Sequence, residues 1–246
     1  METTALTLLI LLVAILYSSV GHGGASGYLA VLSLFAFPAK EASTTALVLN
    51  VIVSGIAFCN FTGAGFLNRK TALPFLLGSV PAAFLGGYFP IHQAVFDGLL
   101  ACAFVAAAFR MLLPLNETPV DKLKSPKSLI LSMIGASIGA LSGVVGIGGG
   151  VILSPVLLFF RWATIKQTAA IAALFILANS LAGLVGRLVS GQLLLGNLTP
   201  MIAVAILGGW LGSSNAAKRF APVQIKYLLA IVLLIAAIRG VTRIIQ

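Results

Sequence analysis

Glycines gather at two points in the chain where apolar sequence lies on both sides. GVVGIGGGVILSP occupies residues 143–155, and GHGGASG occupies residues 21–27. Glycine tolerates a positive φ and lets a ligand approach the backbone closely. A helix that restarts after such a turn presents free N–H groups and the positive end of its dipole, which bind anions. We expect helices to restart at Ala25 and Val151, so both stretches predict an oxyanion site.

Polar side chains in and near these turns can add hydrogen-bond donors. Asn50 and Asn179 each lie near the middle of a predicted span, in corresponding halves of the chain. His22 lies within the first turn, where a neutral imidazole can donate to a substrate. The predicted substrate-binding residues are Gly21, His22, Gly23, Gly24, Ala25, Ser26, Asn50, Gly146, Gly148, Gly149, Gly150, Val151 and Asn179.

Each of these features also has a purely structural explanation. Clustered glycines let helices pack closely, as in GxxxG interfaces, and an Asn in a span can simply bond a neighbouring helix. His22 can equally be a satisfied turn residue. The anion site is favoured because packing alone does not require glycines clustered at the same point of both halves.

The composition excludes a soluble domain. Hydrophobic residues make up 60% of the 246 residues, charged residues only 8%, and the mean hydropathy is +1.13. Soluble domains carry about a quarter charged residues. The first residues, METTALTLL, lack the basic start of a signal peptide, so we interpret the N-terminus as a span. The net charge of +10 lies mostly in short connections, which favours orientation by the positive-inside rule over nucleic-acid binding.

A polar connection divides the chain into two similar halves. Apolar runs cover residues 5–37, 42–61, 71–89, 93–112, 128–160, 167–189, 197–217 and 223–242. The connection at 114–127 separates a first repeat, 1–113, from a second, 128–246. SSVGHGGASGYLAVLSLF in the first half is similar to SGVVGIGGGVILSPVLLFF in the second. This similarity predicts a duplicated unit, which is common in transporters.

The runs 5–37 and 128–160 do not fit single spans. About 20 residues cross a bilayer, and GHGG divides the run 5–37 into pieces of roughly 16 and 13 residues, too short to cross comfortably alone. The run 128–160 breaks at GIGGG in the same way. We expect each run to form a re-entrant hairpin. Hairpins place most Lys and Arg residues on the side of the 114–127 linker, as the positive-inside rule requires, whereas eight straight spans divide them almost evenly.

The sequence therefore predicts an all-α multispanning membrane protein built from two inverted repeats. Each repeat has a glycine-broken re-entrant helical hairpin followed by three transmembrane helices. Both termini are predicted outside and the linker in the cytoplasm. The hairpins then enter from opposite faces, and their tips meet near the midplane. A turn at that depth persists only inside protein or beside a watery cavity, so the tips should line a site.

On these motifs the sequence resembles the TauE/SafE-type sulfite and organosulfonate exporter family. The similarity lies in GIGGGVILSP at 146–155, in GHGGASG at 21–27 and in NSLAG, which starts at Asn179. The first copy departs from the pattern, with Ala25 in place of the third glycine and Ala30 in place of the proline. The resemblance implies a bacterial-type inner-membrane transporter of small sulfur-containing anions, such as sulfite or sulfoacetate.

We therefore expect a secondary transporter, in the exporting direction, with alternating access. No HExxH motif, paired aspartate, Cys/His cluster or GK[ST] sequence is present, so we predict no enzyme activity, no catalytic residue, no metal and no cofactor. The predicted partners are a small anion and the lipid bilayer, without nucleic acid, and a homodimer stays open.

Two alternatives stay open. One is a transporter or channel of the same fold for another small anion or metabolite. The other is a membrane assembly protein that transports nothing. Replacing Gly148 and Gly149 by alanine is expected to stop flux with folded protein still present in a transporter, and only to harm folding in an assembly protein.

Overall fold

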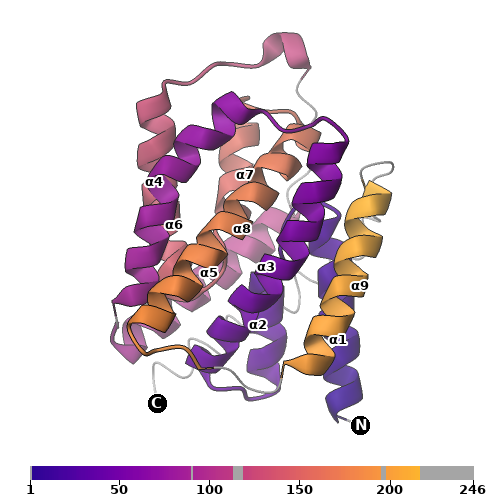
Figure 1. Cartoon of the computed structure of the whole chain (residues 1–246), viewed down its shortest axis with the longest axis vertical. Coiled ribbons are helices and arrows are strands. Elements are labelled where there is room, and N and C mark those ends of the chain that lie inside the picture. The colour runs from indigo at the N-terminus through magenta and orange to yellow at the C-terminus, as the bar shows by residue number, and fades with distance from the viewer. Residues whose placement is uncertain (1, 90, 113–118, 195–197, 217–246) are drawn as a thin grey trace.

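Every element in the described part of the chain is a helix. The computed structural model describes residues 2–89, 91–112, 119–194 and 198–216 (Figure 1). The elements, in chain order, are α1 (Glu2–Ser18), α2 (Ala25–Leu34), α3 (Ala39–Gly63), α4 (Arg69–Tyr88), α5 (Gln93–Leu112), the 3₁₀ helix η1 (Val120–Lys122), α6 (Ser128–Val145), α7 (Gly150–Phe159), α8 (Ile165–Val189) and α9 (Thr199–Ala216). The predicted span 223–242, much of the 114–127 linker and the C-terminus lie outside the described residues.

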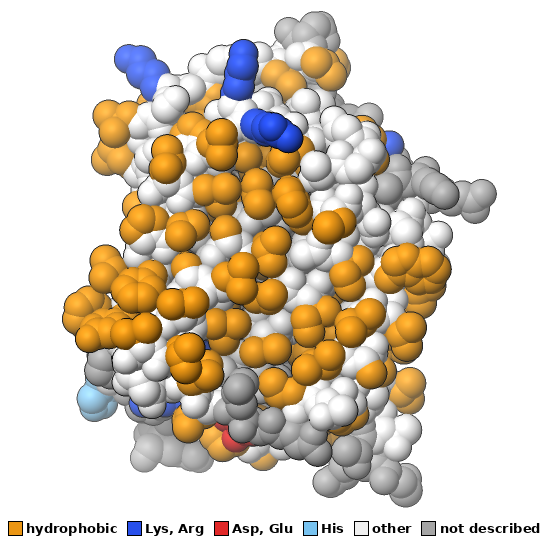
Figure 2. Space-filling view, viewed as in Figure 1, with side chains coloured by type: hydrophobic (Ala, Val, Ile, Leu, Met, Phe, Trp, Pro, Cys, Tyr) orange, Lys and Arg blue, Asp and Glu red, His pale blue; other side chains and the backbone are white. Residues whose placement is uncertain are grey.

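Four of the described helices are long and apolar enough to cross a membrane, namely α3, α4, α6 and α8. The surface agrees with a lipid environment, because Figure 2 shows apolar side chains across the middle of the molecule and Lys and Arg gathered at its upper end. Large apolar residues such as Leu77, Met133, Phe159 and Trp210 are more than half exposed. Exposed apolar surface on this scale marks an interaction with membrane or protein.

Both long apolar runs break at their glycines, and the two pieces of each run have unequal lengths. Helix α1 has 17 residues and α2 only 10, while α6 has 18 and α7 only 10. A ten-residue helix is about 15 Å long, half the hydrocarbon thickness. Helix α2 packs back on α1, because Gly27 lies directly against Val13 and Tyr17. The insertion of these hairpins from opposite faces of a membrane stays a prediction.

The two halves contain helices of matching length in the same order. The ten-residue α2 and α7 are each followed by a 25-residue helix, α3 and α8. The halves also exchange partners, since α6 packs on α4 while α1 packs on α9, as Figure 1 shows at the two sides of the molecule. Helix α8 likewise packs on α4 and α3 on α9. Two copies of one unit are expected to exchange contacts in this way, although their inverted relation stays a prediction.

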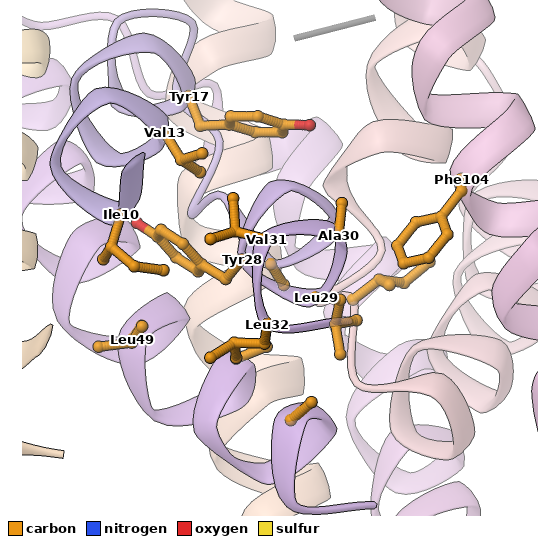
Figure 3. Packing of buried hydrophobic residues seen from close by; sticks show 14 of the residues in the cluster. Ile10, Val13, Tyr17, Tyr28, Leu29, Ala30, Val31, Leu32, Leu49 and Phe104 are labelled. Carbon is orange, nitrogen blue, oxygen red and sulfur yellow. The ribbon is translucent and has the colours of Figure 1, made fainter. Parts of the chain in front are cut away.

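The largest apolar cluster surrounds α2. Figure 3 shows Tyr28, Leu29, Val31 and Leu32 of α2 among apolar residues of α1, α3 and α5, including Phe104 of α5. All nine residues from Ala25 to Ser33 are buried. Helix α2 is therefore enclosed by protein, as the rule for short non-spanning segments at membrane depth requires.

Candidate functional site

The glycines of both turns adopt backbone conformations that other residues rarely adopt. Gly146, Gly148 and Gly149 have φ values of 85°, 70° and 77°, and Gly21 and Gly24 have values of 74° and 102°. Helix α2 begins at Ala25 as predicted, and α7 begins at Gly150, one residue before the predicted Val151. These positive φ values explain why glycine occupies the positions, because glycine has no Cβ that would oppose such a conformation.

The two turns contact each other directly. The Nε2 atom of His22, in the first turn, lies 3.0 Å from the carbonyl oxygen of Gly150 in the second. Ser154 of α7 places its Oγ 3.1 Å from the same nitrogen. On the other side of the ring, Nδ1 lies 3.0 Å from the carbonyl oxygen of Val20. A neutral imidazole donates from only one nitrogen, so the tautomer of His22 decides which carbonyl oxygen accepts its hydrogen bond.

Asn50 of α3 connects both turns to α8. Its Oδ1 accepts a hydrogen bond of 2.9 Å from the N–H of Ala25, the first residue of α2. Its Nδ2 donates to the Oγ of Ser180 at 3.3 Å. Gly23 and Gly148 both lie against the Asn50 side chain, leaving no room for a Cβ at either position. The carboxamide therefore caps α2 and lies against Gly23 of the first turn and Gly148 of the second.

Asn179, the counterpart of Asn50 in the second half, has no such bonds. The residue is fully buried, and neither Nδ2 nor Oδ1 has a hydrogen-bond partner among the described residues. Phe175 packs beside Gly149, and Ile176 packs beside Gly148. Successive side chains turn by about 100° around a helix, so Asn179 projects between the directions of Phe175 and Ile176, one turn further along α8. The free carboxamide therefore belongs to the surroundings of the second turn.

Backbone donors without acceptors surround the same turn. The N–H groups of Gly150 and Val151, at the start of α7, find no acceptor in the part of the chain that the structure describes. Ser142 of α6 packs beside Gly149, and its buried Oγ also lacks a described partner. Buried polar groups normally have partners, so such a concentration indicates a ligand or water position.

Other predicted residues are held by neighbouring protein. Ser26 exchanges a hydrogen bond of 2.9 Å with the hydroxyl of Tyr17. Gly21 lies against the backbone of Ala169, Gly24 against the ring of Tyr28, and Gly146 against Ser43. The structure thus brings His22, Gly23, Asn50, Gly148 and Gly150 to one place, with Asn179 one helical turn further along α8, and it directs the Ser26 hydroxyl toward α1.

Sequence reasoning missed Arg187, which it counted only among the charges that orient the protein in the membrane. The residue is 7% exposed near the end of α8. Its guanidinium donates to the hydroxyls of Ser43 and Thr44 at 2.8 and 3.1 Å, and to the carbonyl oxygens of Gly143 and Val144 at 3.3 and 3.2 Å. The signal was present, because GLVGRLV places an Arg inside an apolar helix, where ionisable residues are usually functional.

Ser142 and Ser154 were also missed, since a serine in an apolar run carries little information on its own. The described residues contain no group of three or more His, Cys, Asp and Glu that could hold a metal ion. The chemistry available around the turns is therefore hydrogen-bond donation from backbone amides, carboxamides and hydroxyls, which suits an anion or a polar neutral molecule.

Comparison with known proteins identifies the family. The family model described as "Sulfite exporter TauE/SafE" matches residues 6–240. The chain belongs to this sulfite exporter family. It is also 33% identical over 243 residues to "Probable membrane transporter protein y4hK" of Sinorhizobium fredii (strain NBRC 101917 / NGR234), which covers 97% of this chain and 98% of the relative. No solved structure gives a significant match.

Membership of the TauE/SafE family confirms the resemblance predicted from the glycine motifs. Together with the four apolar helices, it makes the chain a multi-pass membrane protein of a transporter family. The fold class is confirmed at this level, as a helical membrane protein.

Proposed function

We propose that the chain is a secondary transporter that exports small sulfur-containing anions, such as sulfite or organosulfonates. The anion binds between the two glycine turns, with its oxygens on the donors of the second turn. The proposal rests on two observations. The buried carboxamide of Asn179 has no described partner and lies one helical turn along α8 from Phe175 and Ile176, which pack on the second glycine turn. The N–H groups of Gly150 and Val151 also lack a described acceptor. The family name supports the substrate class, and the relative's name supports transport.

The donors around the turn suit an oxyanion. Backbone N–H groups at a helix start lie at the positive end of the helix dipole, worth about half a charge. A sulfonate or sulfite offers several acceptor oxygens, which can occupy the Gly150 and Val151 amides, the Asn179 Nδ2 and the Ser142 hydroxyl together.

Alternating access requires the two turns to separate. In this conformation, His22 is within hydrogen-bond distance of both the Gly150 carbonyl and Ser154, so the path between the turns is closed by these contacts. Rocking of one repeat against the other would break them and expose the site to one side. Export of an anion from a negative interior gains about 2.3 kcal/mol per charge for each 100 mV, so a uniporter suffices energetically.

We further propose that the protein lies in a bacterial-type inner membrane with the 114–127 linker in the cytoplasm and both termini outside. Figure 2 supports this orientation, because Lys and Arg gather at the end of the molecule where η1 lies in Figure 1. Positive charge concentrates on the cytoplasmic side of membrane proteins.

Reconstitution into liposomes tests the function. Labelled sulfite, sulfoacetate, sulfate and taurine are loaded, and efflux is followed with and without an imposed membrane potential. We expect efflux of sulfite or sulfoacetate above that of protein-free liposomes, faster with an interior-negative potential, and little efflux of taurine, which is a zwitterion. Folded, inserted protein that carries none of these anions would rule the proposal out.

A further inference from the structure

A small cavity opens at the end of the molecule that lies far from the linker. Its volume is about 40 Å³, and its walls come from the ends of α3, α4, α6 and α8 and from the start of α5. Lining residues include Lys40, Gly87, Phe96, Val144, Arg187 and Gln192. Helix α4 runs from Arg69 to Tyr88, so the Gly87 end of the helix is the one opposite Arg69. The described part of the linker lies toward the Arg69 end. The N–H of Lys124 donates to the carbonyl oxygen of Arg161, and the ring of the neighbouring Trp162 packs near that of Phe75.

The cavity carries positive charge without a described carboxylate to balance it. Lys40 and Arg187 line it, and no Asp or Glu is among its described lining residues. Lys40 is exposed, whereas Arg187 is 7% exposed. The acceptors of Arg187 are two hydroxyls and two carbonyl oxygens at the end of α6. The end of a helix supplies only about half a negative charge, so the buried guanidinium retains net positive charge.

The guanidinium also retains unused donors. Its described bonds all start from the two terminal nitrogens, and Nε–H has no acceptor among the described residues. An Arg carries five N–H donors in a planar fork that matches an oxyanion. Ionisable residues buried in a membrane protein usually face a partner, a cavity or a pathway. Here the cavity is beside the charge.

The size and walls of the cavity suit a small anion. A water needs about 10–15 Å³ of such volume, so the cavity has room for about three waters or one small oxyanion. Phe89, Ile91 and Phe96 form apolar walls. Apolar walls lower the local dielectric constant, which strengthens the attraction between an anion and Arg187.

The cavity is separated from the second glycine turn by a single layer of side chains. Arg187 holds the carbonyl oxygens of Gly143 and Val144, and Ser43 donates to that of Val145 at 2.6 Å. Gly146, which opens the turn, lies against Ser43. An anion in the cavity would therefore lie on one side of Arg187 and Ser43, with the turn on the other.

We propose that this cavity is an anion-binding vestibule for a sulfite or sulfonate group, with Arg187 and Lys40 as its cationic ligands. The vestibule lies on the face opposite the linker and holds the anion before or after it passes the turns. This inference rests on the proposed function for its substrate class. If Arg187 served only to cap α6, Lys40 would contribute nothing to anion affinity.

Two variants and a matched control test the vestibule. Lys40→Ala removes an exposed side chain and should not disturb folding. Arg187→Lys keeps the positive charge but loses the planar set of N–H donors that the guanidinium provides. Lys70→Ala removes an equally exposed lysine at the other end of α4. In purified protein, sodium sulfoacetate is titrated against sodium chloride at equal ionic strength while the melting temperature is recorded. The same variants are measured for KM of sulfoacetate efflux in proteoliposomes.

We expect the concentration for half-maximal stabilisation to rise about fivefold in Lys40→Ala, from the loss of one charge near the anion, and not at all in Lys70→Ala. KM should rise in parallel, with a larger effect in Arg187→Lys. Unchanged affinity and KM in Lys40→Ala would overturn the vestibule, even if Arg187→Lys failed to fold. A different result would separate the two proposals. If the wild-type protein binds sulfoacetate in a Lys40-dependent way but transports none of the anions, the proposed function is wrong and the vestibule is still supported.

Discussion

The side chain of Asn50 accepts a hydrogen bond from the N–H of Ala25, at 2.9 Å, and so caps the start of α2 from another helix. The matching carboxamide in the second half, that of Asn179, makes no described bond. The two halves thus use the same residue type differently, one to hold a turn and the other with its donors unbonded. We infer that the first turn is the fixed half of the site and the second turn the half that receives the anion.

Asn50→Leu should destabilise the protein. The substitution leaves the Ala25 N–H and the Ser180 hydroxyl unsatisfied inside the protein, which costs about 1–3 kcal/mol for each group. Thermal or denaturant unfolding in detergent measures the effect. Asn60→Leu is the control, because Asn60 donates only to Ser213, away from the turns, and the loss should be about 1 kcal/mol. Equal stability of Asn50→Leu and the wild-type protein would refute the capping role.

Some glycines within the helices allow close packing against a neighbouring helix. Two variants away from the glycine turns test this role. A Cβ at Gly139 of α6 would collide with the backbone oxygen of Ser79 in α4, whereas a Cβ at Gly98 of α5 would meet nothing within 4 Å. We expect Gly139→Ala to cost about 1–3 kcal/mol or more from overpacking. Gly98→Ala should stabilise α5 by up to about 1 kcal/mol from helix propensity. Similar unfolding temperatures for the two variants would contradict the claim that Gly139 is needed for close packing of α6 on α4.

The turn glycines cannot serve as the functional test that the sequence suggested. At Gly148, with φ of 70°, a Cβ would lie 2.5 Å from Asn50 Nδ2 and 2.8 Å from Ile176. We therefore expect Gly148→Ala to reduce the amount of folded protein, whether or not the protein transports anions. Gly65→Ala is the control, because Gly65 has φ of 81° with nothing near its missing Cβ. That variant should bear only the backbone strain, about 1–2 kcal/mol. Wild-type yields of Gly148→Ala in size-exclusion chromatography would contradict the expectation.

Much of the fold could be predicted because the signals were local. Composition indicates the membrane, glycine clusters mark the helix breaks, and apolar runs give the spans that became α3, α4 and α8. The early end of α2 could not be predicted, since the helix stops at Leu34, and Ala36 turns with φ of 59° inside an apolar run. No composition signal marks that turn.

The site could be predicted only in part, because partners in space are not visible in sequence. Asn50 and Asn179 occupy corresponding positions in the two halves, and the sequence alone does not distinguish their roles. One is bonded to Ala25 and Ser180 and the other to nothing described, a difference that depends on how α2 and α7 dock against α3 and α8. Arg187 was counted only among the charges that orient the protein, because the sequence does not show that its donors reach α3 and α6.

The most direct test of the account replaces the free carboxamide of Asn179 with an apolar group of similar size. Asn179→Leu removes a buried polar side chain that has no described partner, so stability should be kept or raised, since an unsatisfied buried amide costs about 1–3 kcal/mol. Sulfite or sulfoacetate efflux from proteoliposomes should fall by at least about tenfold, equivalent to about 1.4 kcal/mol of lost binding.

Asn60→Leu makes the same chemical change on α3, away from the turns, and should retain efflux. If the anion binds at the second glycine turn, the Asn179→Leu protein should fold but no longer carry the anion. Wild-type efflux from this variant, in liposomes containing the same amount of folded protein, would show that the second glycine turn is not where the anion binds.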